Sequence, residues 1–284
     1  MLETKRYLGL ELAGAKNQKT SLAAIQYYPR ERKTFLLDIF DRIVSHEDQT
    51  SDEALLELIS EESQEQNALM GVNVPLELPP CIGCTKKACE GSARCAGPAV
   101  KWMRDFTAKL ERKSKKARKA REFTPYTQRP VELWVRYHVL PMLPESHRFE
   151  VDEALGGNRA PLTARMHFLK RHLQSLPLVE VWPKLSVSII AGYLNIPKRT
   201  VATYRHLEEG VYSREIILNH LTKDYEIFIY DRDMRKLSQS LTAFDAFICA
   251  FTALLSDQDQ CAKAPKGFPS ASGWVQYPVL DESP

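Results

Sequence analysis

Three isolated acidic residues lie inside segments whose other residues are those of a protein core. Glu11 is the one charged residue in YLGLELAGA, Glu180 is the one in LVEVW, and Asp245 is the one in LTAFDAFICAFTALL. Carboxylates that meet in a cleft repel one another unless they are protonated or share a cation. Clustered oxygen ligands suit Mg²⁺ or Mn²⁺, and ions held in this way can activate water at a phosphodiester. The three acids are therefore candidate ligands of a catalytic metal site.

Each acid also has an ordinary structural explanation. A strand glutamate such as Glu11 or Glu180 can point to solvent, and a helix aspartate such as Asp245 can cap the helix or pair with an arginine. Because an unpaired buried charge is costly, any of these groups that is buried requires a compensating partner. The two explanations differ in one observable, which is whether the three side chains converge.

The hydrophobic patterns place two of these acids on strands and one on a helix. Residues 238–256 have the helical period, and Asp245 shares the apolar side of that helix. Short apolar runs between turn-like segments predict three antiparallel strands at 7–12, 21–28 and 34–40. The other expected elements are a helix at 52–65, a strand at 68–74, a helix over 98–121, a helix at 161–176, a strand at 178–182, a helix that begins at Pro183, a short strand at 226–230 and an edge strand in the C-terminal GWVQYP.

The composition predicts a globular protein without a membrane span. The chain has 284 residues, of which 44% are hydrophobic and 26% are charged. No apolar run reaches the ~20 residues that a membrane helix needs, and the first apolar stretch is too short and polar for a signal peptide. We expect a cytoplasmic protein with no membrane partner.

Four of the six cysteines crowd into one short segment with the spacing Cys81-x2-Cys84-x4-Cys89-x5-Cys95. Four thiolates close in sequence satisfy a tetrahedral Zn²⁺, and they could equally hold an iron–sulfur cluster. Four unrelated loop cysteines are the plain alternative. We favour structural zinc, because a short loop with no core of its own needs a cross-link and no redox partner is implied. Cys249 is most simply a small core residue.

A short basic segment dominates the charge of the chain. Residues 109–121, KLERKSKKARKAR, carry a net charge of +7, whereas the whole chain carries +3. The charges surround the helix axis and leave no apolar stripe, which predicts a solvated helix or a mobile arm. Such density suits sequence-independent, salt-dependent contacts with nucleic acid phosphates, although a merely soluble surface is the plainer alternative. The basic residues of the segment are Lys109, Arg112, Lys113, Lys115, Lys116, Arg118, Lys119 and Arg121, of which the last six are the candidate phosphate-binding residues.

The order of the expected elements resembles the RNase H-like fold. The chain also carries GLELAGAKN, GVNVPLELP, VEVWPKLS, FDAFICAFTAL and GWVQYP, and with them it resembles a family of largely uncharacterised proteins predicted to be nucleases of that fold. The resemblance implies a single RNase H-like α/β domain over residues 1–284, built on a mixed five-stranded sheet flanked by helices. Residues 79–160 would be an insertion that holds the four-cysteine metal loop and the basic helix.

The resemblance also assigns site residues, because RNase H-like active sites draw acids from the first strand, the fourth strand and a late helix. Glu11 matches the first-strand acid, and Glu180 and Asp245 match acids of the family. Asn73 falls where the fourth-strand acid is expected, and its amide oxygen can ligate a cation but brings no charge. Glu77, four residues further on, would compensate if the loop folds back.

Two functions follow from these patterns. The first is a metal-dependent nuclease in which Glu11, Glu180 and Asp245 bind Mg²⁺ or Mn²⁺ and Asn73 or Glu77 completes the shell. The second is a non-catalytic nucleic-acid-binding protein on the same scaffold, which the uncharged Asn73 favours. A phosphotransferase or NTPase is disfavoured, because the sequence has no glycine-rich loop of the G-x-x-x-x-G-K-[ST] type.

Overall fold

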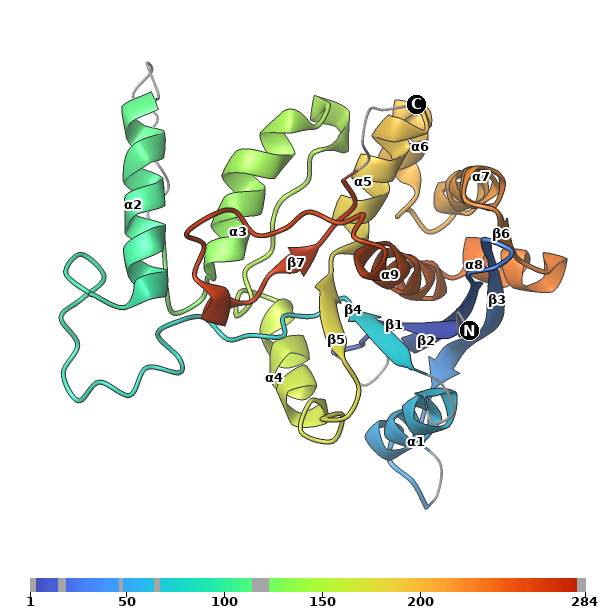
Figure 1. Cartoon of the computed structure of the whole chain (residues 1–284), viewed down its shortest axis with the longest axis horizontal. Coiled ribbons are helices and arrows are strands. Elements are labelled where there is room, and N and C mark those ends of the chain that lie inside the picture. Colours follow the sequence, from blue (N-terminus) through green and yellow to red (C-terminus); the bar gives the residue numbers. More distant parts are fainter. Residues whose placement is uncertain (1–3, 15–18, 46–47, 64–66, 114–122, 280–284) are drawn as a thin grey trace.

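A computed structural model describes residues 4–14, 19–45, 48–63, 67–113 and 123–279, except for the side chains of residues 111–113. Its centre is a seven-stranded mixed sheet in the order β6-β3-β2-β1-β4-β5-β7 (Figure 1). The strands are β1 Lys5–Glu11, β2 Thr20–Tyr28, β3 Lys33–Ile43, β4 Ala68–Val72, β5 Leu178–Val181, β6 Ile227–Phe228 and β7 Val275–Gln276.

The pairing of the strands divides the sheet into two halves. β1, β2 and β3 form an antiparallel meander, as the sequence predicts. On the other side of β1 the pairings of β4, β5 and β7 are all parallel, and β6 pairs parallel to β3 at the far edge. The prediction of a mixed sheet flanked by helices is confirmed. The expected five-stranded sheet did not count the two edge strands. These are β6 and β7, which have two residues each and lie in the segments where short strands were expected.

Helices cover both faces of the sheet. α9 (Leu241–Asp257) crosses one face, and α1 (Ser51–Ser63) and α4 (Arg159–Leu169) lie on the other (Figure 1). The remaining helices are α2 Pro98–Lys113, α3 Pro130–Trp134 with a π-helical continuation Val135–Val139, α5 Pro183–Tyr193, α6 Lys198–Thr203, α7 Glu209–Asp224 and α8 Asp231–Gln239. The sequence predicts α4 as residues 161–176, but the helix begins two residues earlier and ends at Leu169.

α9 approaches the sheet unusually closely because two strand glycines face it. A Cβ on Gly9 would lie 2.0 Å from the carbonyl oxygen of Ala246, and a Cβ on Gly71 would lie 2.3 Å from that of Cys249. Both distances are far below any real contact, so only glycine permits this packing. The side of α9 that carries Asp245 is thereby set directly over β1 and β4. The Ser240 hydroxyl caps the helix by accepting a hydrogen bond from the Ala243 N–H at 3.3 Å.

The segment expected as an insertion, residues 79–160, contains the cysteine loop, α2 and α3. Its first part projects beside the body of the molecule, with α2 next to α3 (Figure 1). The helix expected over 98–121 is described as far as Lys113. The described part of α2 is amphipathic, because Val100, Met103 and Thr107 are buried whereas Lys101 and Lys109 are exposed.

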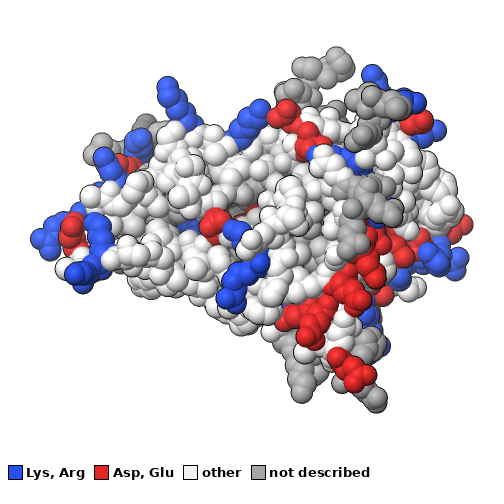
Figure 2. Space-filling model, turned by 60° about the horizontal axis from the view of Figure 1, so that its bottom comes forward, with Lys and Arg blue, Asp and Glu red and all other residues white. Residues whose placement is uncertain are grey.

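The charged residues are unevenly spread over the surface. On the face drawn in Figure 2, acidic side chains gather around α1, whereas lysine and arginine dominate the opposite end, around α2 and the cysteine loop. Within the described ranges no single helix is both long and apolar enough to cross a membrane; α8 and α9 pass that test only as a pair bent by 112°.

Candidate functional site

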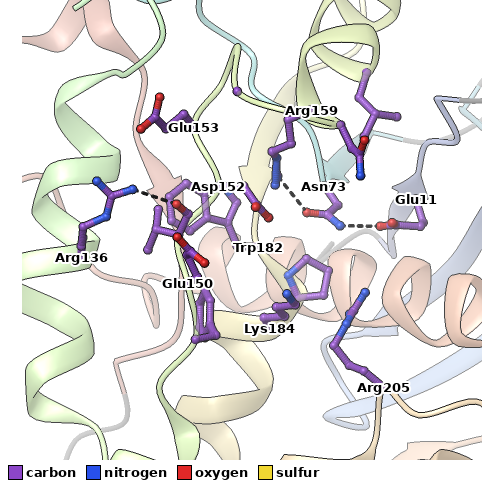
Figure 3. Close-up of a pocket in the computed structure, with 17 residues that line it drawn as sticks. Glu11, Asn73, Arg136, Glu150, Asp152, Glu153, Arg159, Trp182, Lys184 and Arg205 are labelled. Carbon is purple, nitrogen blue, oxygen red and sulfur yellow. Dashed lines mark hydrogen bonds between the residues drawn. The ribbon is translucent and has the colours of Figure 1, made fainter. Parts of the chain in front are cut away.

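A cavity of about 510 Å³ lies at the C-terminal ends of β1 and β4. Its wall combines Glu11 and Asn73 from the sheet, the loop 149–159, the start of α5 at Lys184, and Arg205 from the α6–α7 connection (Figure 3). Carboxylates and basic side chains both point into it. This volume falls within the range of small-ligand sites, which are commonly placed beyond the carboxyl ends of parallel strands.

Glu11, Asn73 and Arg159 form a chain of hydrogen bonds along one wall of the cavity (Figure 3). The Asn73 amide nitrogen donates to Glu11 Oε2 at 2.6 Å, and the Arg159 guanidinium donates to Asn73 Oδ1 at 3.3 Å. Asn73 can do this because the parallel pairing of β1 and β4 continues past β4, where its backbone N–H donates to the Leu10 carbonyl. The structure therefore brings Glu11 and Asn73 together, as the sequence predicts.

Asp245 lies close to Glu11 and is 1% exposed. Burial raises the pKa of Glu11 to about 8, and the nearby charge of Asp245 is the second largest cause of that rise. The pKa of Asp245 is also raised, by burial first, although Arg205 opposes the shift. Two carboxyl groups in this position do not both ionise readily unless positive charge is added.

Arg205 supplies part of that positive charge but leaves one oxygen of Asp245 unused. The Arg205 guanidinium donates to Asp245 Oδ2 at 2.6 Å. Asp245 Oδ1 is buried and has no hydrogen-bond partner among the described residues. A buried acceptor without a partner is rare in folded proteins and requires an explanation, such as a proton or a cation that it binds.

The opposite wall of the cavity carries a second set of charges. Lys184 from α5 and Asp152 from the loop 149–159 both line it (Figure 3). Burial and the charge of Arg205 lower the pKa of Lys184, whereas Asp152 and Asp245 favour its protonated form. Lys184, Arg159 and Arg205 thus line the same cavity as Glu11, whereas Asp245 does not line it and reaches it through its ion pair with Arg205. This arrangement suits an anion that accompanies a cation.

Glu180 does not belong to this site, so the expected convergence of three carboxylates is wrong. Within β5, Leu178 packs with the cluster beneath α1 and α4, and Val179 packs with the cluster beneath α9. Because strand side chains alternate between faces, Glu180 shares the face of Leu178, whereas Glu11 shares the face of Gly9 and α9. The two glutamates therefore lie on opposite faces of the sheet.

Glu180 instead takes part in a buried ion network. The Arg129 guanidinium donates to both of its carboxylate oxygens at 2.7 Å, and the Leu76 N–H and the Trp182 indole N–H donate to them as well. Arg129 also donates to Glu132 at 2.9 Å, and all three charged side chains are at most 1% exposed. Arg129 holds the pKa of Glu180 below its usual value although burial, the largest influence, opposes this.

Glu77 also lies away from the cavity. Its carboxylate accepts a hydrogen bond from the Lys170 ammonium at 2.8 Å, and both side chains are about two-fifths exposed. Glu77 is absent from the residues that line the cavity, whereas Asn73 is among them. Of the two residues considered for completing the metal shell, the structure brings only Asn73 to Glu11.

The four clustered cysteines lie in the loop after β4, and they contribute nothing to the cavity wall. All four are free thiols; Cys81, Cys84 and Cys89 are exposed and Cys95 is half-buried. Across the described parts of the chain, no group of three or more His, Cys, Asp or Glu side chains is arranged to hold a metal ion. The predicted zinc site and the predicted three-carboxylate site are therefore both absent from this arrangement of the described residues.

The side chains of the six predicted phosphate-binding residues all lie outside the described part of the chain. Lys115, Lys116, Arg118, Lys119 and Arg121 lie outside the described residues, as do the side chains of Arg112 and Lys113. Lys109 is exposed on α2, away from the cavity.

The sequence interpretation missed most of the basic groups of the cavity. Arg159 comes from the loop 149–159, which also carries Asp152, whereas Lys184 comes from the start of α5 and Arg205 from the α6–α7 connection. A partial signal was available in GGNRAP, where two glycines precede a basic residue at a helix start, and in Lys184, which directly follows the Pro183 that begins α5. Arg205 had no signal, because it lies in a polar connection.

No protein family, curated protein or solved structure significantly matches the chain.

Proposed function

We propose that this protein is a metal-dependent nuclease of RNase H-like fold that hydrolyses nucleic acid phosphodiesters at the cavity beside Glu11 and Asp245. The observation that carries the proposal is the unpartnered, buried Oδ1 of Asp245 next to a glutamate whose pKa is raised. A divalent cation would satisfy that oxygen and would remove the repulsion between the two acids.

The topology supports the fold assignment. An antiparallel meander of β1 to β3, followed by β4 and β5 in parallel pairing, agrees with the mixed sheet that the resemblance implies. One acid comes from the end of the first strand and the other from a late helix packed on it, which are two of the three positions expected from the resemblance. The third acid is replaced by Asn73.

The oxygen ligands beside Glu11 fit one cation better than two. Glu11, Asp245 and the amide oxygen of Asn73 would hold it, with Mg²⁺ or Mn²⁺ preferred because all three ligands are oxygens. Such an ion supplies charge stabilisation at a phosphoryl oxygen and an activated water. Asn73 Oδ1 accepts a hydrogen bond from Arg159, so it would exchange that hydrogen bond for the cation.

The basic residues have separate tasks in this proposal. Arg159 and Lys184 face the cavity and would hold the phosphate oxygens of the substrate, which orients the phosphodiester relative to the acids. Arg205 opposes the rise in the pKa of Asp245 through their 2.6 Å ion pair and so favours the ionised form of that acid. Glu11, whose pKa is raised to about 8, would give up its proton when the cation binds and would then act as a ligand of that cation.

The test is cleavage of labelled DNA and RNA oligonucleotides in Mn²⁺ by wild type, Asp245→Asn and Glu77→Gln. Asp245→Asn is expected to reduce the cleavage rate by more than the ~100-fold that loss of an outer-shell partner costs. Binding measured by fluorescence anisotropy in chelator should stay within a small factor of wild type. Glu77→Gln is the matched control, because its side chain is exposed and lies outside the cavity.

A nucleic-acid-binding protein without hydrolytic activity is the second candidate. Two observations favour it: Asn73 brings no charge, and Arg205 already occupies one oxygen of Asp245. In that case the wild-type protein would bind oligonucleotides in a salt-dependent manner and would not cleave them in Mg²⁺ or Mn²⁺. Absence of both binding and cleavage would refute both candidates.

A further inference from the structure

The cysteine loop is a long exposed segment with no core of its own. Every residue from Cys81 to Arg94 is exposed, and the loop contains neither helix nor strand. Its ends, however, are fixed. The Cys81 N–H donates to the Pro125 carbonyl at 3.0 Å, and the Arg104 guanidinium of α2 donates to the carbonyls of Ser92 and Cys95. A long loop with anchored ends and an exposed middle requires a cross-link to adopt one conformation.

The four thiols of this loop are close in the sequence, with the spacing Cys81-x2-Cys84-x4-Cys89-x5-Cys95. Four thiolates at such short spacings are the donor set of many structural zinc sites. Because the thiols belong to one loop of short spacings, they can meet without any movement of the sheet or of α2.

Two of the thiols already have the hydrogen bonds that zinc thiolates commonly have. The Gly91 N–H donates to Cys89 Sγ and the Gly97 N–H donates to Cys95 Sγ, each at 3.4 Å and each from two residues further along the chain. Gly91 has φ +78°, which a residue with a side chain rarely adopts. N–H groups directed at sulfur stabilise the thiolate form and orient it as a ligand.

We propose that Cys81, Cys84, Cys89 and Cys95 bind one Zn²⁺ that fixes this loop against α2. No three of the described thiols are positioned to hold an ion, so the four sulfurs would draw together around the metal. The site is structural, because four protein ligands leave no open position for substrate. It is also independent of the proposed nuclease, because the loop supplies no residue to the cavity.

The first test is the metal content of the full-length protein purified without chelator under reducing conditions. We expect about one zinc per chain in wild type and a loss of most of it in Cys84→Ser and Cys89→Ser. Cys261→Ser is the control; this buried thiol lies outside the loop, and a serine hydroxyl can keep its hydrogen bond to the Thr252 carbonyl. Wild-type protein without zinc that also fails to take up added Zn²⁺ overturns the proposal.

Two further outcomes name a different chemistry and overturn the proposal as well. Iron with acid-labile sulfide and visible absorption would identify an iron–sulfur cluster, and loss of free thiols without metal would identify disulfides.

The second test measures loop closure by limited trypsin digestion. Cleavage after Lys86, Lys87 or Arg94 should slow at least tenfold when zinc binds and should recover in chelator. Equal cleavage rates in the two states would show that zinc does not order this loop.

Discussion

Replacement of Arg129 by methionine should destabilise the fold more than almost any other single substitution. The guanidinium of Arg129 joins two buried acids, with 2.7 Å contacts to both oxygens of Glu180 and a 2.9 Å contact to Glu132. The three side chains are at most 1% exposed, so water cannot replace the lost partner. Methionine keeps much of the volume and removes the charge, which leaves two carboxyl groups buried side by side.

The magnitude follows from the cost of breaking a buried ion pair, which is about 3–5 kcal/mol when one partner is removed. A protein of this size is stable by about 5–15 kcal/mol, so the substitution removes a large fraction of the total. The expected fall in melting temperature is about 10 °C. The assay is urea denaturation followed by circular dichroism, with calorimetry for the melting temperature.

A double-mutant cycle separates the network from simple loss of packing. Arg129→Met, Glu180→Gln and the double variant should show a coupling energy of ~1–3 kcal/mol, because Glu180→Gln removes the charge that Arg129→Met leaves unpaired. Glu180→Gln alone should change stability and leave the cleavage rate of the folded protein unchanged. A loss below ~1 kcal/mol in Arg129→Met would refute the view that Glu180 is a structural residue.

Three further predictions concern the cavity. In chelator, a proton bound to Glu11 stabilises the folded state, because the pKa of Glu11 rises from 4.5 in the unfolded chain to about 8 in the folded protein. This stabilisation is complete below pH 4.5 and is lost as the pH rises through 8. The free energy of unfolding, measured by denaturation, should therefore be ~1–3 kcal/mol lower at about pH 9 than at about pH 6, and Glu11→Gln should remove this difference. Gly9→Ala should lower the free energy of unfolding by ~2–3 kcal/mol, because the added Cβ would force α9 away from β1. For the same reason it should weaken Mn²⁺ binding, measured by calorimetry. Loss of stability with unchanged Mn²⁺ affinity would contradict this reasoning. Lys184→Gln should weaken oligonucleotide binding and lower the salt slope by about one, whereas an unchanged slope would place the phosphate elsewhere.

The sequence alone predicted most of the sheet, because its strands carry clear apolar patterns between turn segments. The meander of β1 to β3 and the buried strands β4 and β5 appear at the expected positions within a few residues. The edge strand β7 was also expected. β6 was expected only as a short strand at 226–230, because two residues that pair at the edge of a sheet carry little hydrophobic periodicity.

The site was predicted only in part, because the sequence shows which residues are buried but not on which face of a strand they lie. Glu11 and Asp245 were correctly paired, since a lone acid within an apolar run survives only where something offsets its charge. Glu180 satisfied the same criterion but is offset by Arg129, 51 residues away in the chain. A shift of one residue along β5 would have directed it to the other face, and no pattern within LVEVW determines that choice.

The position of the acid pair follows from the packing of α9 on the two glycines. Gly9 lies two residues before Glu11 on the same face of β1, and it contacts the carbonyl of Ala246, the residue after Asp245. The close approach at Gly9 therefore places Asp245 beside the end of β1, where Glu11 is. Because this contact involves backbone atoms, the separation of the two carboxyl groups is set by the core and not by flexible loops. The basic residues of the cavity wall come from three separate segments, so the acid pair is the part of the proposed site whose position the core fixes.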